Sequence, residues 1–280
     1  MTLPLTLPLT LSDLHPDCDA KLPAPQRCAR ALTAHVLVIT DGLTLPDDDP
    51  SIADGPAGAA AGRVLDRLSA VLSVVPPGTI AVQLRNRRLP VARLHDLALS
   101  LRALTQRHAA PLLINDRLDV ALSVGADGVH LPGHGIAPHT ARRFVGDTLQ
   151  ICAAAHSLAE ARLLSQAGVD AVTLSPIWPT PSKPALPDRQ AGVAPLGIEV
   201  LARAASVLPV PVFALGGVDS VERVAACSAV GARVACLRAL LVGSPQDAAD
   251  RARAFVRATG FPADSPLHTT PSDLAQNERK

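Results

Sequence analysis

Short apolar runs alternate with longer segments of helical periodicity from residue 35 to about residue 258. This alternation is typical of repeated βα units around a parallel sheet. Eight strand candidates can be counted, at residues 35–40, 79–84, 111–114, 127–131, 149–153, 170–174, 210–215 and 233–237. Because these runs are apolar almost throughout, we expect a sheet that is buried on both faces. The pattern predicts an α/β protein with one (β/α)8 TIM barrel.

Turn signals divide the chain between these elements. Gly125, Gly168 and Gly231 come just before or at the start of a strand, so each is expected to end a helix. Residues 46–62, rich in Pro, Asp and Gly, are expected to form a loop after the first strand. The predicted domain limits are an N-terminal tail over residues 1–33, a barrel over 34–259 and a C-terminal tail over 260–280, with partly disordered tails.

Composition narrows the classes of ligand. The formal net charge is +1 and aromatic residues make up 2% of the chain, so there is neither a basic stripe nor a stacking platform for nucleic acid. No apolar run is long enough and free enough of charge and Pro to span a bilayer. We therefore expect neither a nucleic-acid nor a membrane partner, whereas an anionic metabolite fits.

The cysteines bear on the compartment. The chain has five, an odd number, without the spacing of a zinc site or of a disulfide framework. The N-terminal segment is apolar but is broken by repeated Pro and lacks a positive start, so it does not resemble a signal peptide. These features favour a cytoplasmic protein, and the sequence leaves a homo-oligomer open.

Functional residues of such barrels lie at the carboxyl ends of the strands and in the loops that follow. A cationic cluster follows the second strand, with Arg85, Arg87 and Arg88 after Gln83. Guanidinium groups match phosphate oxygens, so this cluster indicates an anion site. Asp116 follows the third strand, where its carboxylate could hold Mg²⁺ or cap the next helix.

Two histidines also end strands. His130 ends the fourth strand and is expected either to be packed in the core or to transfer protons, whereas His156 after the fifth strand fits proton transfer better. A proline-stiffened run from Ser175 to Pro184, with hydroxyls and a lysine, fits an anion clamp. After the seventh strand, Gly216-Gly217 would let backbone N–H groups approach a ligand, next to a loop that commonly binds phosphate at a helix N-terminus.

Taken in this order, the strand-end motifs resemble those of the thiamine phosphate synthase/TenI family over roughly residues 35–258. The motifs are V-L-V-I-T-D, Q-L-R-x-R, L-L-I-N-D-R-x-D, G-A-D-G-V-H-L, A-H-S, P-x-x-P-T-x-S-K and G-G-V. Each motif is weak by itself, whereas their joint order is specific.

The resemblance implies an enzyme of thiamine biosynthesis that couples hydroxymethylpyrimidine pyrophosphate to hydroxyethylthiazole phosphate. The products would be thiamine phosphate and pyrophosphate, with Mg²⁺, Arg85 and Lys183 stabilising the departing negative charge. The residues implied for the pyrimidine pyrophosphate are Gln83, Arg85, Arg87, Asn115 and Lys183, with Asp116 as the Mg²⁺ ligand. Those implied for the thiazole phosphate are Thr180, Ser182 and Gly217.

The chain also departs from the synthase pattern. Gly135 stands where the family supplies its second Mg²⁺ carboxylate, and Ala154 where it has a serine hydroxyl. Arg87 replaces the usual Lys, and Leu131-Pro132 resembles TenI.

Three hypotheses follow from this mixture. The first is synthase chemistry, because one metal carboxylate suffices when substrate oxygens supply the other ligands. The second is a TenI-like thiazole tautomerase that needs no metal and uses His156 as acid and base. The third is a non-catalytic barrel that binds a thiazole or thiamine phosphate. A sugar-phosphate epimerase is a more distant alternative, because the fold alone does not decide function.

Overall fold

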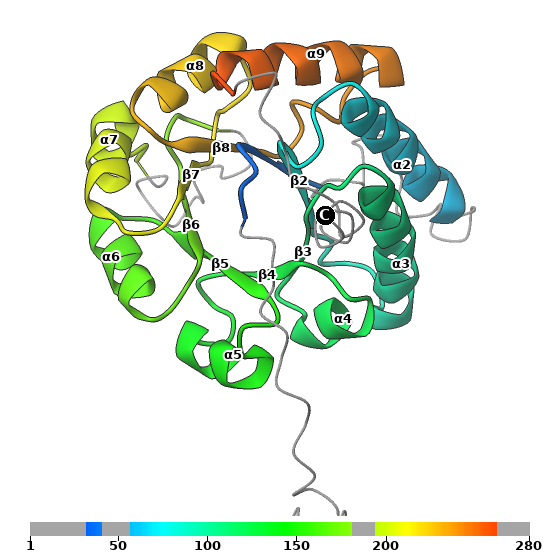
Figure 1. The fold of residues 1–280 in the computed structure, drawn as a ribbon, viewed down its shortest axis with the longest axis horizontal. Helices are drawn as coiled ribbons and strands as arrows, with labels where there is room; N and C mark the ends of the chain where they lie inside the picture. Colours follow the sequence, from blue (N-terminus) through cyan, green and yellow to red (C-terminus); the bar gives the residue numbers. More distant parts are fainter. Residues whose placement is uncertain (1–31, 41–56, 181–193, 262–280) are drawn as a thin grey trace, which may run out of the picture.

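The computed structural model describes residues 32–40, 57–180 and 194–261, and these form a closed barrel of parallel strands surrounded by helices (Figure 1). The strands pair in chain order, and β1 pairs with β8 to close the ring. Their bounds are β1 Val36–Ile39, β2 Ile80–Leu84, β3 Leu112–Asn115, β4 Gly128–Leu131, β5 Gln150–Ala155, β6 Ala171–Leu174, β7 Val212–Ala214 and β8 Arg233–Cys236. The predicted fold class is confirmed, and each observed strand overlaps its predicted range.

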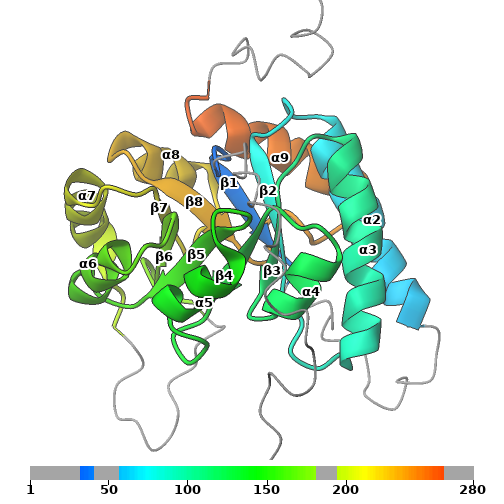
Figure 2. The ribbon, with the colours of Figure 1, turned by 60° about the horizontal axis from the view of Figure 1, so that its bottom comes forward.

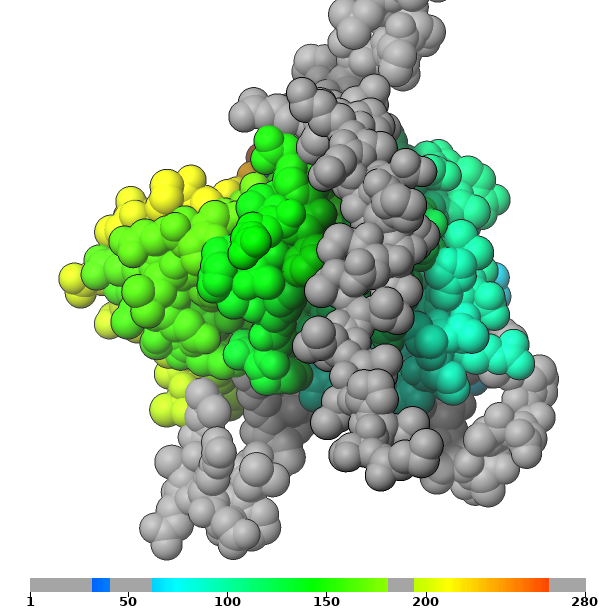
Figure 3. All heavy atoms as spheres, turned by 90° about the horizontal axis from the view of Figure 1, so that it is seen from below, coloured from blue at the N-terminus to red at the C-terminus, as the bar shows by residue number. Residues whose placement is uncertain are grey.

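The helices form the outer layer (Figure 2). They are α2 Ala57–Ser73, α3 Val91–Arg107, α4 Leu118–Ser123, α5 Pro138–Val145, α6 Leu158–Gln166, α7 Gly197–Val207, α8 Val221–Ala229 and α9 Pro245–Ala258. The first and last of these, α2 and α9, pack against each other and close the outer ring. Seen from below, the bright green to yellow-green segments, the colours of α5 and α6, lie together on the outer surface (Figure 3).

One predicted loop is partly wrong. Residues 46–62 were expected to be irregular, but α2 begins at Ala57, and residues 46–56 lie outside the described part of the chain. The sequence Ala-Gly-Ala-Ala-Ala-Gly at the start of α2 contains four alanines, the residue with the highest helix propensity. Glycine lowers helix stability but does not forbid the helix, so composition misled the loop prediction.

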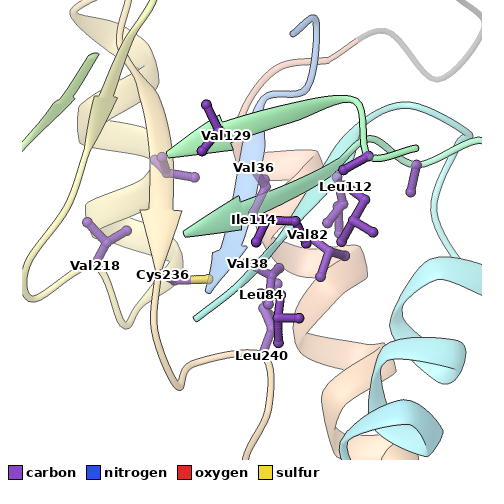
Figure 4. Packing of buried hydrophobic residues seen from close by; sticks show 14 of the residues in the cluster. Val36, Val38, Val82, Leu84, Leu112, Ile114, Val129, Val218, Cys236 and Leu240 are labelled. Carbon is purple, nitrogen blue, oxygen red and sulfur yellow. The ribbon is translucent and has the colours of Figure 1, made fainter. Parts of the chain in front are cut away.

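The sheet divides the core into two layers because side chains alternate along each strand. Outward-facing residues such as Val36, Val38, Val82 and Leu84 pack between the strands and the helices (Figure 4). The inward-facing set is smaller and includes Leu37, Ala81, Leu113, Cys152, Ala171, Phe213 and Ala235. Phe213, fully buried, is the largest of them, so mostly small and aliphatic residues fill the barrel interior.

The glycine motifs act at the amino ends of the strands. Gly125, Gly168 and Gly231 have φ of 61°, 83° and 78°, which confirms them as left-handed residues just past helix ends. Asp127, which follows Gly125 and Ala126 and precedes β4, connects β3 to α3 through hydrogen bonds. Asp127 Oδ2 accepts hydrogen bonds from Leu112 N at 2.8 Å and from Arg102 at 2.7 Å. These contacts are structural, as the sequence predicted for the glycines.

The chain on either side of the barrel also contacts it. Leu32 and Ala34 are buried against the amino ends of the strands, and the ring of Phe261 lies 4.9 Å from that of His35. The predicted tails at residues 1–31 and 262–280 lie outside the described part of the chain. The domain limits therefore stay predictions. No described helix is both long and apolar enough to cross a membrane.

Candidate active site

A pocket of about 430 Å³ opens at the carboxyl ends of the strands. Its lining includes most of the residues that the sequence singled out. Those residues are Gln83, Arg85, Arg87, Asn115, His130, His156, Thr180, Gly216 and Gly217. Strand ends that are far apart in the sequence thus meet at one cavity of the size of small-molecule sites.

The floor of the pocket is polar on one side. Gln83, Asn115, His130 and Thr173 point inward from β2, β3, β4 and β6, and Gln83 donates from Nε2 to Asn115 Oδ1 at 3.1 Å. Gln83 is fully buried, and its Oε1 has no hydrogen-bond partner among the described residues. A buried acceptor without a partner costs free energy unless a ligand satisfies it. The Gln83 oxygen is therefore a fitting contact for a ligand donor.

His130 is a core histidine. It is 6% exposed, and its Nε2 lies 3.0 Å from Thr173 Oγ1. Burial, followed by the charge of Arg85, lowers the pKa of His130 to about 4. The imidazole is therefore neutral at pH 7, and of the two roles expected for His130 the structure favours the packed one.

Arg85 and Arg87 carry positive charge at the rim. Burial and the neighbouring Arg87 lower the pKa of Arg85 to about 10, so it remains a cation at neutral pH. The Arg85 backbone N–H donates to buried Thr40 Oγ1 at 3.0 Å, which holds the start of this loop. Arg88 is exposed and does not line the pocket, so two of the three arginines expected at the anion site are placed there.

Asp116 lies beside the pocket and does not line it. It is exposed, with φ of 66°, and its backbone N–H donates to His130 O at 2.9 Å. The alternative that it caps the next helix is wrong, because Arg117 occupies the N-cap of α4 and no side chain caps that end. The left-handed backbone instead lets the chain leave β3 sharply, and the carboxylate then faces the loop after β4.

His156 is held from two sides. Its backbone N–H donates to Glu160 Oε2 at 2.7 Å, and Ser157 Oγ accepts from Glu160 N at 3.1 Å, so the start of α6 fixes its position. Its Nδ1 lies 2.8 Å from Ser175 O, the shorter of two contacts, and 3.2 Å from Ser175 Oγ. A carbonyl oxygen can only accept, so Nδ1 carries a proton in the neutral ring. In that tautomer Nε2 carries the lone pair of the ring.

The expected anion clamp after β6 is partly described. Thr180 lines the pocket, whereas Ser182 and Lys183 lie outside the described residues. The backbone continues the sheet pairing past the strands, with Ile177 N donating to Leu215 O at 2.9 Å and Trp178 N to Gly216 O at 3.0 Å. The loops after β6 and β7 are therefore joined at the pocket rim.

Gly216-Gly217 have a structural reason beside the expected one, which stays a prediction. Their φ values are 93° and 70°, and a Cβ on Gly217 would lie 2.7 Å from Trp178 Cβ. Glycine is thus required by the backbone and by the loop after β6, in addition to any approach of a ligand. The loop after β8 lines the pocket through Arg238, but α9 begins at Pro245, and a capping box of Ser244 and Asp247 satisfies its N-terminus. The expected helix N-terminus is therefore not the phosphate site there.

Sequence reasoning missed Asp219 and Arg223. Asp219 lines the pocket, and Arg223 Nη1 donates to Gly217 O at 2.6 Å and to Asp219 Oδ1 at 2.8 Å. The signal was present in Gly-Gly-Val-Asp-Ser-Val-Glu-Arg, where Arg223 follows Asp219 by one helical turn.

The fold and the pocket define a (β/α)8 barrel with a cavity at its carboxyl face, lined in part by Arg85, Arg87 and Arg238. The thiamine monophosphate synthase family matches residues 58–240, and the chain belongs to this family. A protein of Geobacter sulfurreducens is 39% identical over 197 residues, 70% of this chain and 88% of that protein. A thiamine-phosphate synthase of Chloroflexus aurantiacus is 32% identical over 204 residues, 72% of this chain and 90% of that protein.

Solved structures agree on the fold. Thiamine phosphate pyrophosphorylase from Pyrococcus furiosus superposes with a TM-score of 0.63 at 24% identity and covers 82% of this chain and 98% of that one. The family and the fold expected from the sequence are confirmed. The relatives also support the expected enzyme type, a transferase of the thiamine phosphate synthase type.

Proposed function

We propose that this chain is a thiamine-phosphate synthase, which joins a pyrimidine methyl pyrophosphate to a thiazole phosphate. One observation carries the proposal: two sets of anion-binding groups face one cavity from opposite sides of the barrel. Arg85 and Arg87 extend from β2, whereas Thr180 and Gly217 come from the loops after β6 and β7. An enzyme with two phosphorylated substrates needs such a pair of sites.

The pyrimidine pyrophosphate fits the side of β2 and β3. Gln83 presents a buried acceptor, which suits an amino group on the pyrimidine ring, and Arg85 and Arg87 suit the pyrophosphate. Asn115 lies within hydrogen-bond distance of Gln83 and orients it. The thiazole phosphate then lies against Thr180 and Gly217, with Ser182 and Lys183 as predicted contacts outside the described residues.

The proposed reaction requires few catalytic groups from the protein. The C–O bond to pyrophosphate breaks, pyrophosphate takes the electron pair, and the thiazole nitrogen forms the new C–N bond with its lone pair. No proton has to be removed from the attacking nitrogen, so stabilisation of the leaving charge is the main task. Arg85, a cation with a pKa of about 10, suits that task from the pocket rim, and Lys183 is proposed to share it.

The residues present could hold a magnesium ion with a single protein carboxylate. No group of three or more potential ligands among His, Cys, Asp and Glu side chains occurs in the described parts of the chain. Mg²⁺ often uses one or two carboxylates and takes its other ligands from phosphate and water. Asp116 would supply the carboxylate, and the ion would neutralise pyrophosphate charge. Exposed Asp116 beside the rim is compatible with this role.

A second candidate function is supported by His156. His156 lines the pocket, and with its Nδ1 proton directed to Ser175 O its Nε2 is the basic nitrogen, as a metal-independent thiazole tautomerase would use for proton transfer. Ala154 lines the pocket at the position where the family was expected to have a serine hydroxyl, which also favours this candidate over the synthase. A barrel that binds these phosphates without turnover is the third candidate.

The test is a chromatographic assay with hydroxymethylpyrimidine pyrophosphate and hydroxyethylthiazole phosphate, with and without Mg²⁺. We expect thiamine phosphate that depends on Mg²⁺, and a loss in Asp116→Asn, whose side chain tolerates the left-handed backbone. His156→Asn should retain synthase activity. No product at high protein concentration would overturn the proposal, and tautomerase turnover abolished in His156→Asn would establish the second candidate.

We also propose that the chain acts on these small phosphorylated metabolites in the cytoplasm. Support comes from the burial of three free cysteines, Cys152, Cys227 and Cys236, in the described structure. Such thiols fit a reducing compartment.

A further inference from the structure

The turn after β7 packs closely against the loop after β6 at Gly217. A Cβ on Gly217 would lie 2.7 Å from Trp178 Cβ, 3.0 Å from Pro179 O and 3.4 Å from Arg223 Nη1. Two separate parts of the chain, the loop after β6 and α8, therefore approach Gly217 closely. Gly217 itself lines the pocket, so whatever holds this contact also shapes the pocket wall.

Arg223, on α8, makes three interactions there. Its Nη1 donates to Gly217 O at 2.6 Å and to Asp219 Oδ1 at 2.8 Å. Its guanidinium carbon lies 5.3 Å from the ring centroid of Trp178, which is a cation–π contact. One side chain thus connects the turn after β7, the loop after β6 and α8.

The bond to the carbonyl has a consequence for the pocket. In a planar trans peptide the C=O and the following N–H point in opposite directions, so fixing Gly217 O also fixes the direction of Val218 N–H. Gly217 O is directed at Arg223 on the outer helix, whereas Gly217 and Val218 line the pocket. Among the described residues, no backbone carbonyl accepts from the N–H groups of Gly217 or Val218. These donors are therefore available to an anion in the pocket.

The bond to Asp219 has a second consequence. The Asp219 carboxylate lines the same pocket and would repel a phosphate bound at Gly217. Arg223 pairs with this carboxylate and offsets its charge. The cation does not have to touch the ligand to favour anion binding.

We propose that Arg223 is a positioning residue for the phosphate monoester subsite at Gly217 and Val218, where it directs the backbone donors and neutralises Asp219. The inference rests on the proposed function and adds a residue to it. It predicts that Arg223 affects the thiazole phosphate, on the side of β6 and β7, and spares the pyrimidine pyrophosphate on the side of β2.

The alternative interpretation is an ordinary surface ion pair. Arg253–Asp250 on α9 provides the comparison, because it has an N···O distance of 2.7 Å and the exposed fractions of its side chains, 41% and 60%, are similar to the 36% and 65% of Arg223 and Asp219. The hydrogen bond of Arg253 joins it to Asp250 within α9, whereas Arg223 bonds to the turn after β7 and contacts a tryptophan distant in sequence. Arg253→Ala is therefore a matched control.

The experiment measures binding of hydroxyethylthiazole phosphate, and of inorganic phosphate as a minimal probe, by calorimetry on the full chain. Arg223→Ala should raise the Kd for the thiazole phosphate about tenfold, the size expected for one charge-assisted hydrogen bond. Arg223→Lys, which keeps a cationic donor, should recover part of the affinity. Arg253→Ala should match the wild type within a factor of about two.

The role of Asp219 is tested in the same series. Asp219→Asn introduced into Arg223→Ala should restore part of the lost phosphate affinity, because the unpaired carboxylate is removed. In steady-state assays, Arg223→Ala should raise KM for the thiazole phosphate more than it lowers kcat, and should leave KM for the pyrimidine pyrophosphate unchanged. A general loss of structure would instead move both KM values and the unfolding temperature.

The outcomes separate the two proposals. Equal affinities for Arg223→Ala and the wild type, with the wild type binding well, would overturn the positioning role and leave the proposed function intact. Binding of inorganic phosphate that depends on Arg223, without binding of the thiazole phosphate, would support the positioning role and contradict the proposed function. A wild-type chain that binds neither probe would contradict both.

Discussion

The carboxylate of Asp116 lies where a side chain at position 135 would begin. A Cβ built on Gly135 would be 2.7 Å from Asp116 Oδ1, so the one carboxylate of the proposed metal site points at the position from which the family's second carboxylate is missing. Asp116 is exposed and can shift, and Gly135 does not have a positive φ that would forbid a side chain.

Gly135→Asp should therefore create a tighter magnesium site. The two carboxylates would repel each other without metal, so we expect a lower unfolding temperature in chelator and a larger gain on adding Mg²⁺ than in the wild type. Differential scanning fluorimetry across a Mg²⁺ titration measures this without turnover. Gly135→Asn, similar in shape but uncharged, should show no larger gain, and an identical Mg²⁺ response in both variants would contradict the prediction.

Ala109 is expected to be a stability defect. It has φ of 48° at the end of α3, where Ala110 N donates to Thr105 O and Ala109 N to Gln106 O, in the position that Gly125 and Gly231 occupy after α4 and α8. A left-handed Ala costs about 1 kcal/mol, so Ala109→Gly should raise the free energy of urea unfolding by about that amount. Exposed Ala103, within the same helix, is the control, because Ala103→Gly should lower it by about 1 kcal/mol.

His130 should make the metal-free protein sensitive to acid. The pKa of His130 is lowered by burial, then by Arg85, from 6.5 to about 4, so the unfolded chain binds a proton in this range and the folded chain does not. The free energy of unfolding should be highest above pH 6.5 and fall toward pH 4, by up to about 3 kcal/mol.

Denaturant titrations between pH 4 and pH 7 measure this effect of His130. His130→Gln should show a shallower dependence, because Gln does not titrate, and equal slopes in the two proteins would rule out His130 as the cause. His35, whose pKa is also lowered, titrates in both proteins, and its contribution cancels in the difference.

The single tryptophan should report ligand binding. Trp178 is half-buried, touches the position of Gly217 and stacks with Arg223, and it lies between the pocket-lining residues Pro176 and Thr180. We expect its fluorescence to change when hydroxyethylthiazole phosphate binds and to stay constant with the thiazole alcohol, which lacks the phosphate. A constant signal at a ligand concentration that calorimetry shows to be saturating would exclude this loop from the site.

The sequence by itself determined the order and type of the elements. Apolar runs separated by helical periodicity located each strand, because burial on both faces leaves a continuous apolar signal. It also located the strand ends, where Gln83, Asn115 and His156 stand, and these residues do line one pocket. Local chemistry was sufficient wherever a residue's neighbours in sequence decide its structure, as for Gly125.

The tertiary structure decided the protonation and the contacts of residues whose neighbours in space are distant in sequence. His130 became a neutral core residue through burial against Thr173, Asp116 came to face Gly135 rather than to cap α4, and Arg88 does not line the pocket. The contacts of Arg223 with Gly217 and Trp178 exist only because α8 packs beside the turn after β7 and the loop after β6. The physical reason is that pKa values, hydrogen-bond partners and steric limits depend on atoms brought together by barrel closure, which sequence spacing does not encode.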